Sequence, residues 1–139
     1  MDSKKLNKNF KIKNLLVPIS KIPVLYENDM LKDALEKMSE LKYGICFCIK
    51  KNGKLCGVLT DGDIRRKILN IQKPFSALLS DDLIFHINGK PSKAKINDSI
   101  IKCLKIMEQK LIWDLPVVDK NNKLLGMLHL HPIVKKLVF

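Results

Sequence analysis

The sequence predicts an α/β (α+β) fold made of two tandem β-α-β-β-α units related by pseudo-two-fold symmetry. When the chain is shifted by 69 positions, its second half aligns with its first without a gap, and Asp29 falls on Asp98. The same shift places Gly57 on Gly126. Each half also shows an apolar stripe at helical spacing, followed by two apolar runs that flank a turn. Such a repeat predicts two similar halves that pack on each other and leave a cleft, where small molecules usually bind.

The elements of the first half follow from this pattern in chain order. Residues 22–24 read as a short extended segment, and residues 30–41 as a helix with one buried stripe. The unbroken apolar run 45–49 predicts a strand covered on both faces. Asn52-Gly53 predicts a hairpin turn, after which residues 55–59 return as a strand. A helix is then expected from Thr60 to about residue 69.

The second half restarts the same order of elements. Asn97-Asp98 supplies capping chemistry for a helix, residues 115–118 and 124–128 read as strands, and Pro132 opens the terminal helix at its first turn. The predicted organisation is a basic N-terminal arm (1–12), a first repeat (13–70), a connector (71–88) and a second repeat (89–139).

Length and composition predict a cytoplasmic protein with a packed core and no membrane contact. The chain has 139 residues, of which 46% are hydrophobic, enough for one compact core or two small units that share one. No apolar run approaches the roughly 20 residues that span a bilayer. The Lys- and Asn-rich N-terminus has no apolar core of the kind that a signal peptide requires.

The net charge of +12 makes nucleic acid a partner to consider. However, Arg65 and Arg66 are the only arginines, and lysine lacks the planar fork that reads bases or grips phosphates with two bonds. The lysines are also scattered along the chain. We therefore expect a solvated basic surface, and nucleic-acid binding remains the less favoured alternative.

The cysteines and histidines predict no metal site and no catalytic centre. The four cysteines lie in apolar segments and read as small buried residues of a reducing compartment. His129 and His131 share a strand face but lack a third ligand nearby. The chain also has no nucleophile elbow and no phosphate loop of the Walker type. It is expected to be a sensor or regulator, and no enzyme by itself.

Residues 57–66, 115–119 and 125–131, in their duplicated β-α-β-β-α setting, resemble the CBS domain pair, also called the Bateman module. The Thr-Asp-Gly-Asp-Ile-Arg-Arg run at 60–66 and the Leu-His-Leu-His run at 128–131 are similar to the C-terminal CBS pair of arabinose-5-phosphate isomerases. That family makes a precursor of Kdo, a sugar acid of lipopolysaccharide. A similar first motif occurs in CBS pairs fused to sugar nucleotidyltransferases. Since the sugar isomerase domain precedes the pair in the isomerases, this chain is expected to be an excised regulatory region or a stand-alone relative.

The predicted site lies where the second strand of the first repeat runs into a helix. The start of a helix offers unpaired N–H groups to a phosphate, to which the Thr60 hydroxyl can add a bond, and Asp63 can accept from ribose hydroxyls. Arg65 and Arg66 follow within reach of an anionic tail. Thr60 and Asp63 are equally a capping pair, and both readings can hold at once.

The resemblance implies these same roles for Thr60 and Asp63, and it adds an apolar wall for the base. The expected ligand is a regulatory adenine or cytidine nucleotide, such as AMP, ATP or a CMP-sugar, and no other cofactor is expected. The residues expected against the base are Ile22, Pro23, Val24 and Ile45.

The second repeat departs from this pattern. His129 and Pro132 align with Thr60 and Asp63, so no carboxylate is expected there to hold a ribose, and one ligand per chain is predicted. His129 and His131 either contact an anionic group or pack in the core or an interface.

The sequence therefore favours a regulatory CBS pair that controls an attached or partner sugar-phosphate enzyme and forms a homodimer through its CBS pairs. The attached enzyme would be an arabinose-5-phosphate isomerase with its own sugar isomerase domain. The alternatives are a structural dimerisation module with an empty cleft, the CBS pair of a sugar nucleotidyltransferase, and a nucleic-acid binder.

Overall fold

The computed structural model describes residues 10–138, which divide into two compact units. One unit is Ile19–Pro91, and the other combines the described residues up to Pro18 with the chain from Ser92 onward. The sequence assigns residues 13–18 to the first repeat, whereas in the structure they pack with the second. Most of the predicted basic arm, residues 1–9, lies outside the described residues.

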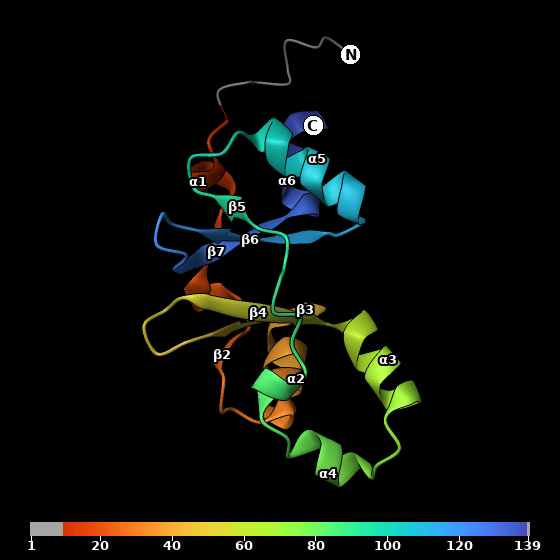
Figure 1. Ribbon diagram of the computed structural model, residues 1–139. Coiled ribbons are helices and arrows are strands. Elements are labelled where there is room, and N and C mark those ends of the chain that lie inside the picture. Colours follow the sequence, from red (N-terminus) through yellow and green to blue (C-terminus); the bar gives the residue numbers. More distant parts are fainter. Residues whose placement is uncertain (1–9, 139) are drawn as a thin grey trace. The chain divides into compact units, whose positions relative to one another are not determined.

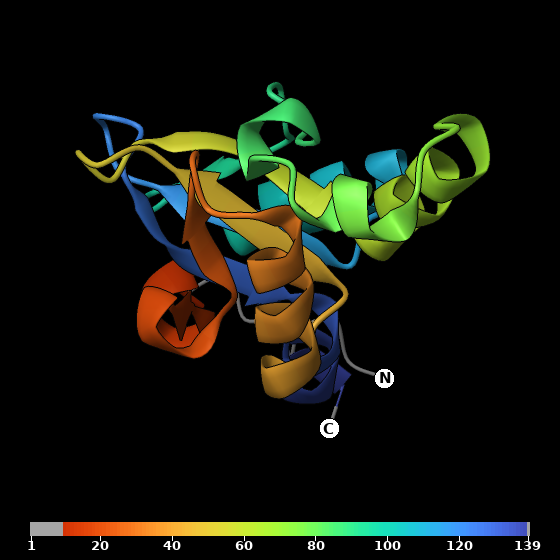
Figure 2. The same ribbon diagram turned by 90° about the horizontal axis from the view of Figure 1, so that it is seen from below.

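The unit Ile19–Pro91 is built around a three-stranded sheet in the order β2-β3-β4. Strand β2 pairs parallel with β3, and β3 pairs antiparallel with β4. Helix α2 packs on this sheet (Figure 1), and seen from below α2 and α4 lie in front of its strands (Figure 2). The elements are β2 (Val24–Tyr26), α2 (Leu31–Leu41), β3 (Ile45–Ile49), β4 (Leu55–Thr60), α3 (Asp61–Asn70), α4 (Phe75–Leu79) and the 3₁₀ turns Ile19–Lys21 and Leu83–Phe85.

The other unit has a four-stranded sheet in the order β1-β7-β6-β5, which repeats the same plan with one added strand. Helices α5 and α6 pack on this sheet (Figure 1). Strand β1 extends it by pairing antiparallel with β7. The elements are α1 (Ile12–Leu15), β1 (Val17–Pro18), β5 (Ala94–Lys95), α5 (Ile100–Lys110), β6 (Asp114–Val118), β7 (Leu124–His129) and α6 (Leu130–Val138). The β-α-β-β-α order predicted for each half is confirmed.

The repeat extends to the backbone conformation of single residues. Helices α2 and α5 both end on a residue in the left-handed region, Lys42 with φ 62° and Leu111 with φ 53°. Both hairpins also turn through a positive φ, 87° at Gly53 and 65° at Asn122. Glycine and asparagine adopt this conformation at little cost, so the predicted Asn-Gly turn is confirmed, and Asn122 turns the second hairpin in the same way.

The start of α5 corrects the predicted cap. Ser99, and not Asn97-Asp98, caps α5 by accepting from the Lys102 N–H at 3.1 Å. Asp98 instead accepts from the Lys95 N–H at 2.9 Å and so closes the turn before the helix. Asp and Ser both cap helices, so the sequence does not distinguish Asp98 from Ser99 as the cap of α5. The choice depends on where the turn before the helix closes.

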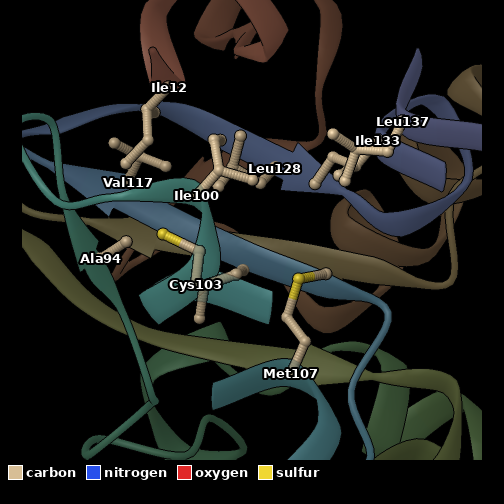
Figure 3. Close-up of a cluster of buried hydrophobic side chains, with 10 residues drawn as sticks. Ile12, Ala94, Ile100, Cys103, Met107, Val117, Leu128, Ile133 and Leu137 are labelled. Atoms are coloured by element: carbon tan, nitrogen blue, oxygen red, sulfur yellow. The ribbon is translucent and has the colours of Figure 1, made fainter. Parts of the chain in front are cut away.

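Each unit has its own hydrophobic core. Figure 3 shows the core of the unit that contains α5, where Cys103 and Met107 of that helix meet Leu128 of β7 and Ile133 of α6. Ile12, which the sequence places in the basic arm, is fully buried in this cluster. The core of the other unit joins α2 to β3, β4 and the connector, through residues such as Leu31, Cys46, Leu59, Leu78 and Leu83.

Two glycines allow a neighbouring chain segment to approach each sheet. A Cβ atom on Gly57 would lie 2.2 Å from the Asn88 carbonyl oxygen, and a Cβ on Gly126 would lie 2.2 Å from that of Val17. Both carbonyls belong to segments that run along the outer edge of the hairpin, where Asn88 bridges to Val58 and Val17 pairs with Met127. Only glycine leaves room for such an approach.

Within the described residues, no helix is long and apolar enough to cross a membrane.

Candidate functional site

Thr60 and Asp63 form a reciprocal cap at the junction of β4 and α3. Thr60 has an extended backbone, and its hydroxyl oxygen accepts from the Asp63 N–H at 3.2 Å. The Asp63 carboxylate accepts in return from the Thr60 N–H at 3.0 Å. The capping interpretation of this pair is therefore correct as geometry. Two of the N–H groups at the start of α3 are thereby used, and the Asp61 N–H donates to the Gly44 carbonyl at 3.0 Å. The positive end of the helix dipole still favours an anion.

The second oxygen of the Asp63 carboxylate faces a cation. Arg66, one turn further along α3, donates from Nη2 to Asp63 Oδ1 at 2.9 Å. Partial burial raises the pKa of Asp63, but the Thr60 N–H and the Arg66 guanidinium lower it more, so the pKa lies below its usual value. Asp63 is therefore an ionised acceptor at neutral pH. Arg65 is exposed and forms no ion pair within the described residues.

The predicted apolar residues lie on β3, at the start of β2 or just before β2. Ile45 opens β3 directly opposite Thr60 on β4. Ile22 and Pro23 precede β2, whose Val24 pairs with Phe47 two positions further along β3. Ile22 and Ile45 are only 2% and 4% exposed, whereas Val24 is half-buried. The fold thus brings these residues to the same end of the sheet as Thr60, with most of their surface in contact with protein.

A cavity of about 390 Å³ lies beside Asp63, between α3 and the end of the connector. Asp63 and Arg66 are the predicted site residues that line it. The other polar side chains in its wall are Lys67, Asn70, His86 and Asn88. Its volume is at the lower end of the range for small-molecule sites.

His86 belongs to a polar network that the sequence does not reveal. The side chain is 6% exposed, and its Nε2 lies 2.8 Å from Asp81 Oδ2. The same carboxylate accepts from Lys73 Nζ at 2.7 and 2.9 Å. Hydrogen bonds from Lys73 and then His86 hold the pKa of Asp81 below its usual value. In the sequence, Asp81 reads as a turn residue and His86 as an isolated histidine, so no spacing could have joined them.

A larger hollow of about 670 Å³ lies at the opposite end of β2 and β3, lined by residues that include Tyr26, Lys50 and Asn52. It contains no buried polar side chain and none of the predicted site residues. The cavity beside Asp63 is therefore the better candidate for a specific ligand.

The second repeat has a carboxylate that the alignment misses. His129 Nδ1 lies 2.6 Å from Asp114 Oδ1, and Asp114 opens β6 at the position equivalent to Ile45. Burial raises the pKa of Asp114, and the contact with His129 lowers it in part. The aligned positions His129 and Pro132 supply no carboxylate, as expected from the sequence, but the neighbouring strand β6 places that of Asp114 beside His129. That this half does not hold a ribose remains a prediction. Pro132 and His131 are exposed in α6.

The thiols are poor nucleophiles in this fold. Burial raises the pKa of Cys46 and of Cys48 to about 12, and that of Cys103 to about 11. Among the described residues, no group of three or more His, Cys, Asp or Glu side chains is arranged to hold a metal ion. The side chains of Arg66 and Lys67 in the wall of the cavity beside Asp63 suit the binding of an anionic group.

The sequence of this chain is similar to those of known proteins. The sequence profile of the family described as CBS domain matches residues 12–70 and 84–138. An uncharacterized protein of Helicobacter pylori strain J99 is 34% identical over 126 residues, which are 90% of this chain and 36% of that protein. Arabinose 5-phosphate isomerase KdsD of Pseudomonas aeruginosa is 29% identical over 117 residues, which are 82% of this chain and 34% of the isomerase. The chain thus spans about a third of the length of these relatives.

Solved structures share the fold at lower identity. The crystal structure of CBSX2 in complex with AMP matches with a TM-score of 0.79 and 23% identity, over 91% of this chain and 95% of that one. At this level of identity the likeness concerns the fold.

Proposed function

The chain belongs to the CBS domain family, with two copies of the domain in tandem, and we propose that it is a regulatory module whose first copy binds an adenine nucleotide. The observation that carries the proposal is the ionised Asp63, which stands between the start of α3 and a cavity that also holds Arg66 and Lys67. A carboxylate suits ribose hydroxyls, and cations suit a phosphate. The AMP bound to CBSX2, a protein of the same fold, supports this choice of ligand.

The regulated activity is proposed to be that of an attached or partner sugar-phosphate enzyme, such as an arabinose-5-phosphate isomerase of Kdo synthesis. The proposal is supported by the similarity to KdsD, of which this chain matches about a third. Nucleotide binding would change the activity of the enzyme only if the module has two conformations that differ in their affinity for the nucleotide.

Calorimetric titration tests the nucleotide proposal. AMP, ATP, CMP and a CMP-sugar are titrated into the wild-type chain and into Asp63→Ala. We expect AMP to bind, and Asp63→Ala to weaken its binding by about 1.5–3 kcal/mol, the range for hydrogen bonds to a charged group. A clear preference for the cytidine ligands would redirect the proposal to nucleotide sugars.

Asp33→Ala is the matched control. Asp33 accepts from the Met30 N–H at 3.0 Å at the start of α2, which is the bond that Asp63 makes at the start of α3, and it does not line the cavity. Its removal should lower stability to a similar extent and leave nucleotide affinity unchanged. Equal affinities of the wild type and Asp63→Ala would refute the assignment of Asp63.

A structural dimerisation module is the second candidate. It is favoured by one observation, that both oxygens of Asp63 already have partners in Thr60 and Arg66. The absence of binding heat from any of the four ligands would support this candidate.

A further inference from the structure

The cavity beside Asp63 has a buried histidine with one bonded and one unbonded ring nitrogen. His86 Nε2 is held by Asp81, whose ionised carboxylate can only accept a hydrogen bond. Nε2 therefore donates to Asp81, and Nδ1 is the ring nitrogen left for a further hydrogen bond. Within the part of the chain that the structure describes, Nδ1 is buried and has no hydrogen-bond partner. A buried polar atom without a partner is costly, so a hydroxyl that reaches Nδ1 removes this cost.

The opposite wall of the same cavity carries positive charge. Lys67 and Arg66 project from adjacent positions of α3, and Asn70 adds an amide one turn further on. The charge of Arg66 is partly balanced by Asp63, whereas no carboxylate is recorded within salt-bridge distance of Lys67 among the described residues. The wall formed by α3 thus suits an anionic group, and the wall that contains His86 suits a hydroxyl, which can donate or accept a hydrogen bond.

We propose that this cavity holds a phosphorylated sugar, either free or as the ribose phosphate of a nucleotide. Its phosphate lies against Lys67 and Arg66, and one of its hydroxyls forms a hydrogen bond with His86 Nδ1. The inference rests on the proposed function, because Asp63 belongs to both, and it adds His86 as a contact from outside the repeat motif. The small volume of about 390 Å³ limits the ligand to about the size of a mononucleotide.

Binding in this cavity is coupled to the connector. Because Nδ1 is closed to solvent, the hydroxyl reaches it only if the wall next to His86 moves. That wall is the end of the connector, which the Lys73–Asp81–His86 network and the hydrogen bonds between Asn88 and Val58 fix in place. Occupancy should therefore alter the connector as well as α3.

Two variants of His86 separate ligand contact from folding. In His86→Gln, the amide can still donate to Asp81 from near the position of Nε2, and nothing replaces Nδ1. In His86→Asn, the shorter amide leaves a polar atom near Nδ1 and loses Asp81. We expect His86→Gln to weaken binding of AMP and of ribose 5-phosphate about three- to tenfold, the effect of one hydrogen bond. His86→Asn should keep more of the affinity and melt at a lower temperature without ligand.

The phosphate contact has its own pair of variants. Lys67→Ala should weaken the binding of both ligands. Lys37→Ala removes the same charge from an exposed position on α2 and should leave both affinities unchanged. Adenosine and inorganic phosphate, titrated separately, should each bind more weakly than ribose 5-phosphate. Equal effects of Lys67→Ala and Lys37→Ala would overturn the phosphate assignment.

A direct readout on the wild-type protein does not depend on the stability of any variant. With ¹⁵N-labelled histidine, the Nδ1 resonance of His86 should shift when ribose 5-phosphate or AMP saturates the site. An unchanged resonance at saturation, or wild-type affinity in His86→Gln, overturns the inference. If AMP binds but without dependence on His86, the nucleotide proposal stands and the inference fails. If only ribose 5-phosphate binds, and depends on His86, the inference stands and the nucleotide proposal fails.

Discussion

Asp63 caps α3 and is also proposed to bind the ligand, and its contribution to the cap depends on pH. Its carboxylate accepts from the Thr60 N–H and from Arg66, and these bonds hold its pKa in the folded protein below the usual value of 3.8. A group whose pKa is lowered by folding stabilises the folded state above its unfolded pKa, and this contribution is lost as the pH falls through the folded pKa. The capping role of Asp63 should therefore fade in acid.

Asp63→Asn should lose about 0.5–2 kcal/mol of unfolding free energy at pH 7, the range for a helix cap. The difference from the wild type should shrink below pH 3.8. Urea denaturation of both proteins at several pH values between neutral and acid measures it. Asp81 and Asp98, whose pKa values are also lowered, titrate in both proteins and cancel in the difference. A difference that stays constant with pH would show that the carboxylate charge contributes nothing to the cap.

At the scale of elements, each hairpin depends on a glycine that lets another segment lie against it. The close approach of the Asn88 carbonyl to Gly57 makes the end of the connector an edge of the β2-β3-β4 sheet. The same end of the connector carries His86 into the cavity. The position of the cavity therefore depends on the contact between Gly57 and Asn88, although Gly57 does not line the cavity.

Gly57→Ala should destabilise the protein by about 1–3 kcal/mol, because the added methyl group overlaps the Asn88 carbonyl and forces the backbone to move. Gly89→Ala is the matched control, since its Cβ would meet its nearest atom at 3.9 Å. The change in midpoint of urea denaturation measures both. A near-neutral Gly57→Ala would mean that the connector adjusts at little cost.

At the scale of the whole molecule, exposed apolar side chains on α3 and α6 favour self-association. Ile68 and Leu69 of α3 are 43% and 72% exposed, and Val134 of α6 is 40% exposed. Exposed apolar groups that recur on one helix of each repeat suit a contact between copies of the chain. The homodimer predicted from the sequence remains a prediction.

Light scattering at tens of micromolar protein should give twice the mass of the chain. Leu69→Glu should shift this mass toward that of the monomer, because it would place a charge in an apolar contact. Ile101→Glu, on an α5 residue that is 42% exposed, is the control and should leave the dimer intact. A wild-type protein that is monomeric at this concentration would contradict the prediction.

The net charge of +12 is also a property of the whole molecule, and it separates a ligand sensor from a nucleic-acid binder. If the N-terminal lysines follow a DNA backbone, about five phosphate contacts would give a log–log salt slope of roughly −4 to −5. We expect only weak binding near physiological salt, because the basic residues are scattered and almost all are lysines. The lysines in question are Lys4, Lys5, Lys8, Lys11 and Lys13.

The five N-terminal lysines can be tested without disturbing the core. Deleting residues 1–13 would remove Ile12, which is fully buried, so replacing the five lysines by alanine is the cleaner change. Submicromolar binding of duplex DNA at physiological salt, lost in the substituted protein, would show that the charge has a nucleic-acid function.

The repeated order of elements could be predicted from the sequence, because each element depends on a local pattern of apolar and turn residues. The helical stripe of 30–41, the unbroken run 45–49 and the Asn-Gly turn each depend on near neighbours, and each is confirmed in the structure. The Thr60–Asp63 cap could be predicted for the same reason, since both partners lie within one turn of α3.

Which distant residues share a site could not be predicted from the sequence and is seen in the folded chain. The Lys73–Asp81–His86 network, the pairing of Asp114 with His129 and the burial of Ile12 all join residues across loops or strands. No periodicity connects such positions. Their contacts are set by strand register and by where the connector docks, and both follow from packing of the whole chain. The polar groups that make the Asp63 cavity a candidate site therefore became visible only in the folded structure.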